Sequence, residues 1–185
     1  FSSPLFYAEN IRFVCSAQLV VVKSAKLKLR NCVIISKMED KPRMVAVAVQ
    51  EGSEARFIRC SVEECFSGGG ILAHGSVVEM TECEVTSCAC DGLELRYGAK
   101  AIVTQCRFHR NKIGVTIVHG ASATIRDCTI ENNRHEGLLV QSGASVNVVG
   151  GSVRHNGKFG VTLQQHLSKL NITGCSIQDN MFWGM

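Results

Sequence analysis

Residues 123–140 read ATIRDCTIENNRHEGLLV. Apolar residues alternate with polar ones before Cys128, and the alternation resumes directly after it. Period-two alternation is typical of short β-strands with one buried face, so we expect two such strands with a bend at Cys128. A glycine then precedes a third apolar run at residues 138–140. This stretch therefore predicts three short strands separated by bends.

The same pattern recurs along most of the chain. The Cys128 position is occupied in successive units by Cys32, Cys60, Cys83, Cys106, Cys128, Gly151 and Cys175, at spacings of 28, 23, 23, 22, 23 and 24 residues. A β-sandwich also has short strands, but it would not keep residue type in register at a constant period. No unit has room for the crossover helix of a βαβ unit. The repeat therefore predicts an all-β fold: a right-handed single-stranded parallel β-helix (solenoid) of about seven coils, with three short strands per coil.

The expected boundaries follow from the repeat. We expect the β-helix to span residues 19–185 and residues 1–18 to form an N-terminal cap or a partial coil. A solenoid end without a cap exposes apolar ladders and unpaired backbone groups. The chain stops where the third strand of the last coil should begin, with no polar cap before that point. The stack is therefore expected to continue further or to be closed by a partner.

Cysteines dominate the bend before the second strand of each unit. Stacked coils lie about 4.8 Å apart, so equivalent side chains form ladders along the axis. That spacing exceeds the ~3.5–4.5 Å that usually separates the Cβ atoms of a disulfide. We therefore expect a structural ladder of buried free thiols, packed as small hydrophobic side chains. Reduced thiols favour an intracellular location, cytoplasmic rather than secreted. The ladder comprises Cys60, Cys83, Cys106 and Cys128.

Asparagines form a second expected ladder, five residues after the cysteine position. Asparagine tolerates left-handed backbone geometry, and its amide can bond to the asparagine above and below it. These side chains are therefore predicted to stabilise a corner of the coil. They are Asn111, Asn133, Asn156 and Asn180.

The repeat resembles a known family. Residues 125–133 and 172–180 follow the pattern I-x-x-N-x-I-x-x-N, with cysteine at the first asparagine position, and similar units cover residues 19 to 185. This pattern resembles the parallel β-helix repeats of the pectin-lyase-like superfamily. The resemblance implies the fold and leaves the function open, since the superfamily includes polysaccharide lyases and hydrolases, sugar epimerases, and non-catalytic adaptors such as F-box proteins. We expect this chain to stand closer to the non-catalytic proteins than to the enzymes.

Composition and charge argue against several classes of partner. The net charge of +4 comes from 20 basic and 16 acidic residues that are dispersed along the chain, so no nucleic acid is expected. No apolar run reaches the ~18–20 residues that cross a bilayer. The cysteine spacings of zinc modules are absent. We therefore predict no membrane span, no metal and no cofactor.

A site is most readily sought on the outer face of the third strands, where enzymes of the superfamily hold their substrates. The period predicts a run of outward apolar residues on this face, and contiguous exposed apolar area marks an interaction surface. We therefore expect a non-catalytic scaffold or protein-interaction module, belonging to a larger assembly. Its partner would be another protein chain or flanking segments of the same chain. The expected interface residues are Val20, Val22, Ala48, Ile71, Ala73, Val118 and Leu139.

A carbohydrate-binding or carbohydrate-processing domain (lyase, hydrolase or epimerase) is the alternative. His74, Tyr97 and His119 occupy one slot of successive coils and could form a recognition rim. Sugar sites usually show several exposed aromatic rings, whereas this strip offers essentially Tyr97 alone. The possible polar recognition residues are Glu94, Arg96, Tyr97, Thr116, His119, Gln141, Thr162 and Gln164.

Carboxylates are scarce on this face. Glycoside hydrolysis needs two of them, roughly 5–9.5 Å apart, on either side of the scissile bond. Only Glu94 is expected to point outward, with Asp91 on the corner before it, and the simplest partner of Glu94 is Arg96. If the segment were catalytic, these three residues and His119 would be the ones to suspect. We assign no catalytic residue and expect no enzyme activity.

Overall fold

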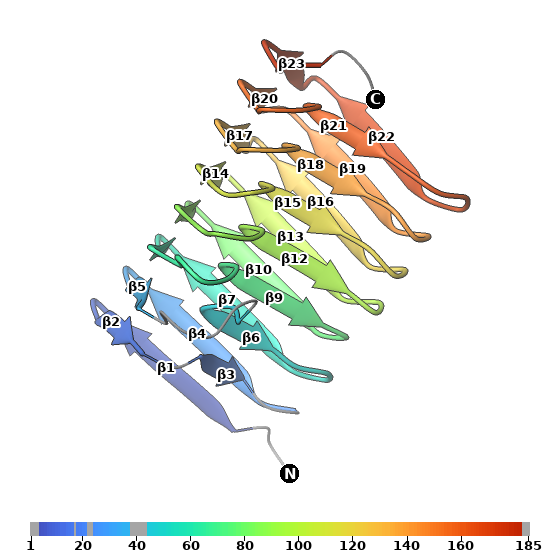
Figure 1. Ribbon diagram of the computed structural model, residues 1–185. Coiled ribbons are helices and arrows are strands. Elements are labelled where there is room, and N and C mark those ends of the chain that lie inside the picture. The colour runs from blue at the N-terminus through green and yellow to red at the C-terminus, as the bar shows by residue number, and fades with distance from the viewer. Residues whose placement is uncertain (1–3, 17, 22–23, 38–43, 183–185) are drawn as a thin grey trace.

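The computed structural model describes residues 4–16, 18–21, 24–37 and 44–182, without the side chains of residues 20 and 21. This part of the chain forms β-strands and contains no helix, so no helix in it could cross a membrane. All paired strands run parallel, and each strand from β1 to β20 pairs with the strand three places further along the chain. Figure 1 shows the resulting stack of coils, with the chain termini at opposite ends. The predicted parallel β-helix is confirmed.

The strands form three parallel sheets, called sheets A, B and C. Sheet A contains the first strand of each coil: β1 (Leu5–Glu9), β4 (Lys26–Arg30), β7 (Glu54–Ile58), β10 (Val77–Thr81), β13 (Lys100–Thr104), β16 (Ser122–Arg126), β19 (Ser145–Val149) and β22 (Lys169–Thr173). Sheet B contains the second: β2 (Arg12–Cys15), β5 (Val33–Ser36), β8 (Ser61–Glu63), β11 (Glu84–Thr86), β14 (Arg107–His109), β17 (Thr129–Glu131), β20 (Ser152–Arg154) and β23 (Ser176–Gln178). Sheet C contains the third: β3 (Leu19–Val21), β6 (Val47–Val49), β9 (Ile71–His74), β12 (Leu93–Arg96), β15 (Val115–Ile117), β18 (Leu138–Val140) and β21 (Val161–Leu163).

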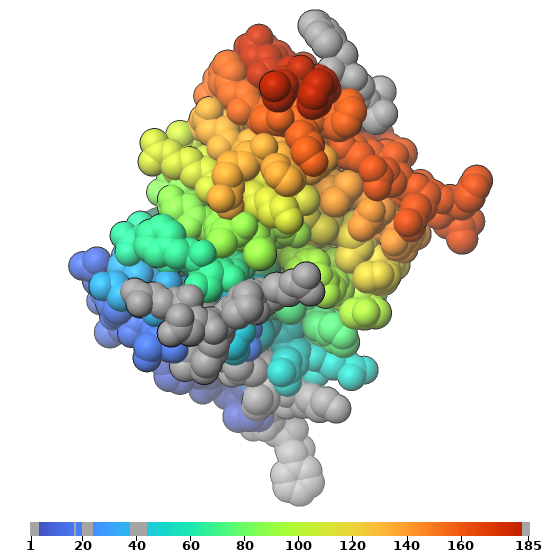
Figure 2. Space-filling view, in the orientation of Figure 1, coloured from blue at the N-terminus to red at the C-terminus, as the bar shows by residue number. Residues whose placement is uncertain are grey.

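These strands make seven coils with three strands each, followed by β22 and β23. The segment expected as a cap or partial coil contributes β1 and β2, which pair with β4 and β5. In the space-filling view the coils follow one another in chain order from one end of the molecule to the other (Figure 2). Each coil therefore packs on its neighbours in sequence, as expected for a solenoid.

The corners depend on single residues in the left-handed backbone region. Between sheets A and B these include Arg59, Glu82 and Gln105, with φ of 51°, 52° and 53°. The backbone N–H of Glu82 donates to the carbonyl of Thr104 in the next coil at 3.0 Å, which holds the corner in place. A non-glycine residue in this region costs roughly 1–2 kcal/mol. The coil-to-coil hydrogen bonds offset that cost.

At the corner between sheets B and C, the left-handed residue is not the one expected. Asn132 and His155 have φ of 53°, and each stands directly before a ladder asparagine. The ladder residues Asn133 and Asn156 are not themselves left-handed. Their contribution is side-chain hydrogen bonding, so the expectation of left-handed geometry at the ladder asparagines was wrong by one residue.

Glycine precedes the third strand because the coils approach closely there. A Cβ added to Gly92 would lie 2.7 Å from the carbonyl oxygen of Gly114 and 2.8 Å from the side-chain nitrogen of Asn111. Both distances are shorter than real Cβ contacts allow. The glycine position thus permits the asparagine ladder to pack against the start of sheet C.

Aliphatic and aromatic ladders fill the interior, and the thiol ladder lies among them. All ten cysteines are free, and Cys60, Cys83, Cys106 and Cys128 are buried. The Cys83 thiol donates to the carbonyl of Thr81 at 3.2 Å and accepts the backbone N–H of Cys60 at 3.4 Å. In the same way, the Cys106 thiol accepts the backbone N–H of Cys83, and the Cys128 thiol accepts that of Cys106, each at 3.4 Å. The thiols therefore cap backbone N–H groups as well as fill space.

Candidate functional site

The outer face of sheet C carries most of the residues that we singled out from the sequence. Strand pairing aligns Ala48 with Leu72, Leu72 with Glu94, and Glu94 with Thr116. The same row continues through Leu139 to Thr162. A second outward row lies two residues further along each strand. The face is therefore two parallel rows of side chains, spaced by one coil.

Two of the expected interface residues point the other way. Ile71 and Ala73 are 0% exposed and belong to the hydrophobic core. Ile71 pairs with the inward-facing Leu93, so the outward residues of β9 are Leu72 and His74. A shift of one residue exchanges the two faces of a strand. The prediction that Ile71 and Ala73 face outward was therefore wrong.

The predicted exposed apolar strip is also absent from the described part of this face. Ala48 and Val118 lie outside the core cluster, yet both are buried. Both are short side chains beside longer neighbours: Leu72 pairs with Ala48, and Arg96 precedes Val118 by one coil. The backbone of Val20 pairs with Ala48, while Val22 lies outside the described residues.

What remains exposed and apolar in the first outward row is modest. Leu72 and Leu139 are both half-buried, and they lie on either side of Glu94 and Thr116. Among the described side chains of this row, these two leucines are the apolar ones that reach a partner. The other described side chains of the row are small or polar.

Glu94 and Arg96 form an ion pair at the centre of the face. Arg96 donates to the Glu94 carboxylate through Nε and Nη2. Burial raises the pKa of Glu94, and the nearby Asp91 charge raises it further, while Arg96 opposes both effects. Burial also raises the pKa of Asp91. The carboxyls of the two residues therefore bind protons more readily than they would in water.

A pocket of about 250 Å³ brings these groups together. Asp91, Glu94, Arg96 and Lys112 all line it. Three of the four residues suspected for catalysis thus share one pocket. The fourth, His119, lies in the adjoining ring stack, and its electrostatic effect lowers the pKa of Glu94. Lys112 also lines the pocket, although it was not singled out from the sequence for this face.

A stack of rings borders the face, as we expected from the equivalent positions of His74, Tyr97 and His119 in successive coils. The ring centroids of His74 and Tyr97 are 4.5 Å apart, and those of Tyr97 and His119 are 4.8 Å apart with nearly parallel planes. Tyr97 is 54% exposed. The stack presents ring edges and polar atoms to solvent, beside the pocket.

The polar recognition residues divide into two groups. Gln141 is half-buried and Gln164 is exposed, so both can reach a partner. Thr116 and Thr162 are 4% and 9% exposed. The Thr116 hydroxyl lies close enough to the Asp91 carboxyl to lower its pKa by hydrogen bonding, whereas among the described residues the Thr162 hydroxyl has no hydrogen-bond partner. Buried hydroxyls without partners are uncommon, because each costs about 1–3 kcal/mol. The Thr162 hydroxyl is therefore available to a group that covers it.

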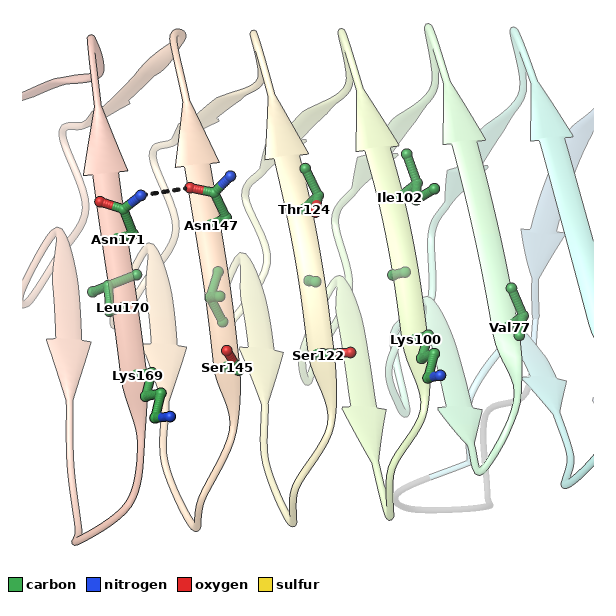
Figure 3. Close-up of a pocket in the computed structure, with 13 residues that line it drawn as sticks. Val77, Lys100, Ile102, Ser122, Thr124, Ser145, Asn147, Lys169, Leu170 and Asn171 are labelled. Carbon is green, nitrogen blue, oxygen red and sulfur yellow. Dashed lines mark hydrogen bonds between the residues drawn. The ribbon is translucent and has the colours of Figure 1, made fainter.

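A groove on the outer face of sheet A was not anticipated from the sequence. It encloses about 650 Å³ and runs across β10, β13, β16, β19 and β22. Figure 3 shows its two rows of side chains. Its walls are formed by Val77, Lys100, Ile102, Ser122, Thr124, Ser145, Asn147, Lys169 and Asn171. These residues stand six and four positions before the cysteine position of each unit, so the repeat could have located them.

No metal site emerges from residues 4–16, 18–21, 24–37 and 44–182. Within them, no group of three or more His, Cys, Asp or Glu side chains is placed to hold an ion. The thiols of Cys65 and Cys88, which lie at one corner of successive coils, donate to the backbone carbonyls of Glu63 and Thr86.

Stacked parallel coils with hydrogen-bonded corner ladders define a parallel β-helix protein. The sequence profile of the family described as "Right handed beta helix region" matches residues 45–185, so the chain belongs to that family. The solved structure of the periplasmic alginate epimerase AlgG superposes with a TM-score of 0.67 at 14% identity, covering 94% of this chain and 47% of that one. A point mutant of the same enzyme gives a TM-score of 0.69 with the same identity and coverage.

At 14% identity these matches show the fold alone. This chain spans about half the length of the solved structures that it matches. No curated protein sequence matches it. The fold agrees with the resemblance to the pectin-lyase-like superfamily that the repeat pattern indicated.

Proposed function

We propose that this chain is a non-catalytic recognition module that binds another protein through the outer face of sheet C. The observation that carries the proposal is the charge content of that face. Among its described outward residues, only Glu94 and Arg96 belong to the Asp, Glu, Lys and Arg group, and they pair with each other. Depletion of charged residues is the compositional mark of the centre of a protein interface.

The remaining side chains suit the same role. Leu72 and Leu139 provide two apolar contacts on either side of the ion pair. Thr162 offers a buried hydroxyl that a partner's backbone could satisfy. Burying such a face would therefore supply hydrogen-bond partners rather than remove them.

The class of protein and its location follow from the same features. Non-catalytic members of the superfamily, such as F-box adaptors, use this fold without a catalytic centre, and we place the chain with them. Ten free cysteines fit a reducing compartment, so we place it inside the cell, in the cytoplasm. The partner is another protein chain or a flanking segment of the same protein.

Leu139→Glu provides the direct test. The substitution places a carboxylate at the centre of the proposed interface, and an unpaired buried charge costs several kcal/mol. Leu167→Glu is the matched control, because Leu167 is 86% exposed in a turn outside sheet C. Partners captured by the wild-type protein are identified and purified, and their binding to each variant is measured by calorimetry.

We expect Leu139→Glu to abolish binding of the purified partner and Leu167→Glu to leave it unchanged. Equal binding by both variants would remove sheet C from the interface. Glu94→Gln should alter binding little, since Glu94 is already paired with Arg96.

One observation favours a second candidate, a carbohydrate-processing activity on acidic sugars. Asp91 and Glu94 share a pocket with two cationic side chains, and both carboxyls have a raised pKa. A carboxyl group with a raised pKa can act as a general acid or base near neutral pH. The matched solved structures include an alginate epimerase, although only the fold is shared.

Alginate oligosaccharides are therefore the substrate to try first. Epimerisation is followed by NMR, and cleavage by the absorbance of the unsaturated product. Turnover by the wild-type protein that disappears in both Asp91→Asn and Glu94→Gln would favour this candidate over the interface. Absence of turnover, together with loss of partner binding in Leu139→Glu, would favour the interface.

A further inference from the structure

The groove on sheet A differs from the rest of that sheet's outer face in how its charges are arranged. In the first coils, charged side chains on this face have partners: Lys26 pairs with Glu54 at 2.9 Å and Arg56 with Glu79 at 3.2 Å, while Lys28 lies over the Tyr7 ring at 5.5 Å. In the groove, Lys100 and Lys169 make no ion pair with any described residue. The groove is lined by no Asp or Glu.

The hydrogen-bonding groups of the groove are similarly uncommitted. Within the part of the chain that the structure describes, the hydroxyls of Ser122, Thr124 and Ser145 have no hydrogen-bond partner. Asn171 donates to Asn147 at 3.1 Å, which leaves the other end of each amide open. The groove thus combines two unpaired cations with a line of free hydroxyl and amide groups.

An apolar contact lies at one end of the groove. Ile102 is 54% exposed and Val77 is 40% exposed, and Val77 pairs directly with Lys100. Figure 3 shows Val77 and Ile102 at the same end, with Lys169 at the far end. A ligand that fits would have an apolar group beside its first negative charge.

We propose that this groove binds an extended acidic peptide segment of a partner protein, independently of sheet C. The partner's carboxylates would pair with Lys100 and Lys169, and an apolar residue would contact Ile102. The peptide backbone would hydrogen-bond with the hydroxyl and amide groups between them. Charge complementarity identifies the partner, because both charged groups of the groove are cations without partners.

The spacing of the lysines sets the spacing of the carboxylates. Lys100 and Lys169 lie in one row, separated by Ser122 and Ser145. Three coil steps of about 4.8 Å give roughly 14 Å. An extended peptide rises about 3.3 Å per residue, so the two carboxylates should stand about four residues apart.

An acidic polysaccharide would satisfy the charges but not the remaining features. No aromatic ring lines the groove, whereas stacking on rings is a usual means of holding sugar rings. Two exposed aliphatic side chains favour a peptide, which can supply a matching apolar residue. The experiment includes a saccharide to separate the two.

The probe is a fluorescein-labelled peptide, Leu-Gly-Glu-Gly-Ser-Gly-Glu, whose leucine and two glutamates share one side of an extended chain. It is titrated with the folded chain and followed by fluorescence anisotropy at two salt concentrations. Its control has glutamine in place of both glutamates, and a labelled alginate oligosaccharide is titrated in parallel. Lys100→Glu and Lys169→Glu are compared with Arg110→Glu, which makes the same change of charge at an exposed corner between sheets B and C. Thermal unfolding verifies that each variant is folded.

We expect saturable binding of the acidic peptide that weakens as salt rises, and weaker binding of the glutamine peptide. Each lysine variant should weaken binding by about tenfold or more, and Arg110→Glu by less than about twofold. The proposal is overturned by absence of saturation up to about 1 mM, by equal binding of the two peptides, or by equal effects of all three substitutions. Binding of the oligosaccharide in preference to the acidic peptide would also overturn it.

Discussion

The side-chain oxygen of Asn156 accepts two hydrogen bonds from Asn133, one from its backbone N–H at 3.1 Å and one from its side-chain amide at 3.0 Å. Both residues are buried. In the same way, the side-chain oxygen of Asn133 accepts the backbone N–H of Asn111 at 3.0 Å, and that of Asn180 accepts the backbone N–H of Asn156 at 3.1 Å. Each coil therefore satisfies a corner N–H of the coil before it.

The ladder asparagines also donate. The side-chain nitrogen of Asn133 donates to the carbonyl of Phe108 at 3.1 Å, and its side-chain oxygen accepts the backbone N–H of Asn111 at 3.0 Å. One side chain therefore serves a backbone acceptor and a backbone donor of the preceding coil. Asn133→Leu would leave these backbone groups without partners. We expect a loss of about 1–3 kcal/mol in the free energy of unfolding, measured by urea denaturation.

Asn147→Leu is the control for that substitution, because Asn147 lies on the outer face of sheet A and makes its side-chain hydrogen bond at the surface. Its effect should stay below about 1 kcal/mol. Equal destabilisation by both substitutions would show that the buried corner amides contribute no more to stability than an amide at the surface.

The thiols give a second prediction. Seven of the ten free cysteines are buried, and Cys15, Cys90 and Cys175 are half-buried. Burial raises the pKa of Cys15 and Cys175, which lowers their thiolate fraction and slows their reaction. Ellman's reagent should therefore find at most about three reactive thiols in the native protein, and ten after denaturation without reductant. Recovery of disulfides instead would contradict both the free-thiol ladder and the cytoplasmic location.

The outer face of sheet B predicts a dependence of stability on pH. Glu131 is buried and contacts Arg107 at 2.6 Å and Arg154 at 2.9 Å. Burial raises its pKa, but the hydrogen bonds and charges of the two arginines outweigh this effect, so the pKa is lowered overall. A lowered folded-state pKa stabilises the protein above the unfolded-state value of about 4.3, and the contribution is lost as pH falls through the folded value.

Glu131→Gln should therefore lower the free energy of unfolding by about 1–3 kcal/mol at neutral pH, measured by urea denaturation. The difference between wild type and variant should shrink as the pH falls below about 4.3. A difference that stays constant down to pH 2 would show that the carboxylate charge is not the stabilising feature.

Much of the fold was readable from sequence because ladder positions repeat at a nearly constant spacing. Cys128 and Asn133 could be placed from that period alone, as could the ring contact of Tyr97 with its neighbours. A local insertion changes the number of residues between the cysteine position and the third strand. Because three successive glycines occupy residues 68–70, the start of the strand was assigned one residue too early, and Ile71 and Ala73 were predicted to face outward although they face inward. The repeat period predicts whether a side chain points inward or outward only where the first residue of the strand is correctly assigned.

Exposure was harder to predict than direction. Val118 points outward but is buried, because its exposure depends on the length of the side chains in adjacent coils. Asp91 and Lys112 come from corners of two successive coils, where strand alternation gives no direction, and the pocket that they line also takes in residues of two earlier coils. The sheet A groove could have been located from the repeat, but its depth depends on neighbouring side chains across five strands.

The inside–outside assignment of sheet C can be tested with two adjacent leucines. Leu138 is 0% exposed and belongs to the core, whereas Leu139 is half-buried on the outer face. Leu138→Glu places a carboxylate among the aliphatic ladders, and an unpaired charge there costs several kcal/mol, so this variant should unfold or lose most of its stability. Leu139→Glu can direct its carboxylate to solvent, and its free energy of unfolding should change by less than about 1 kcal/mol. Thermal and urea unfolding of the two variants measure the difference. Because a shift of one residue exchanges the faces, the reverse order of stabilities would place Leu139 in the core and remove it from any interface.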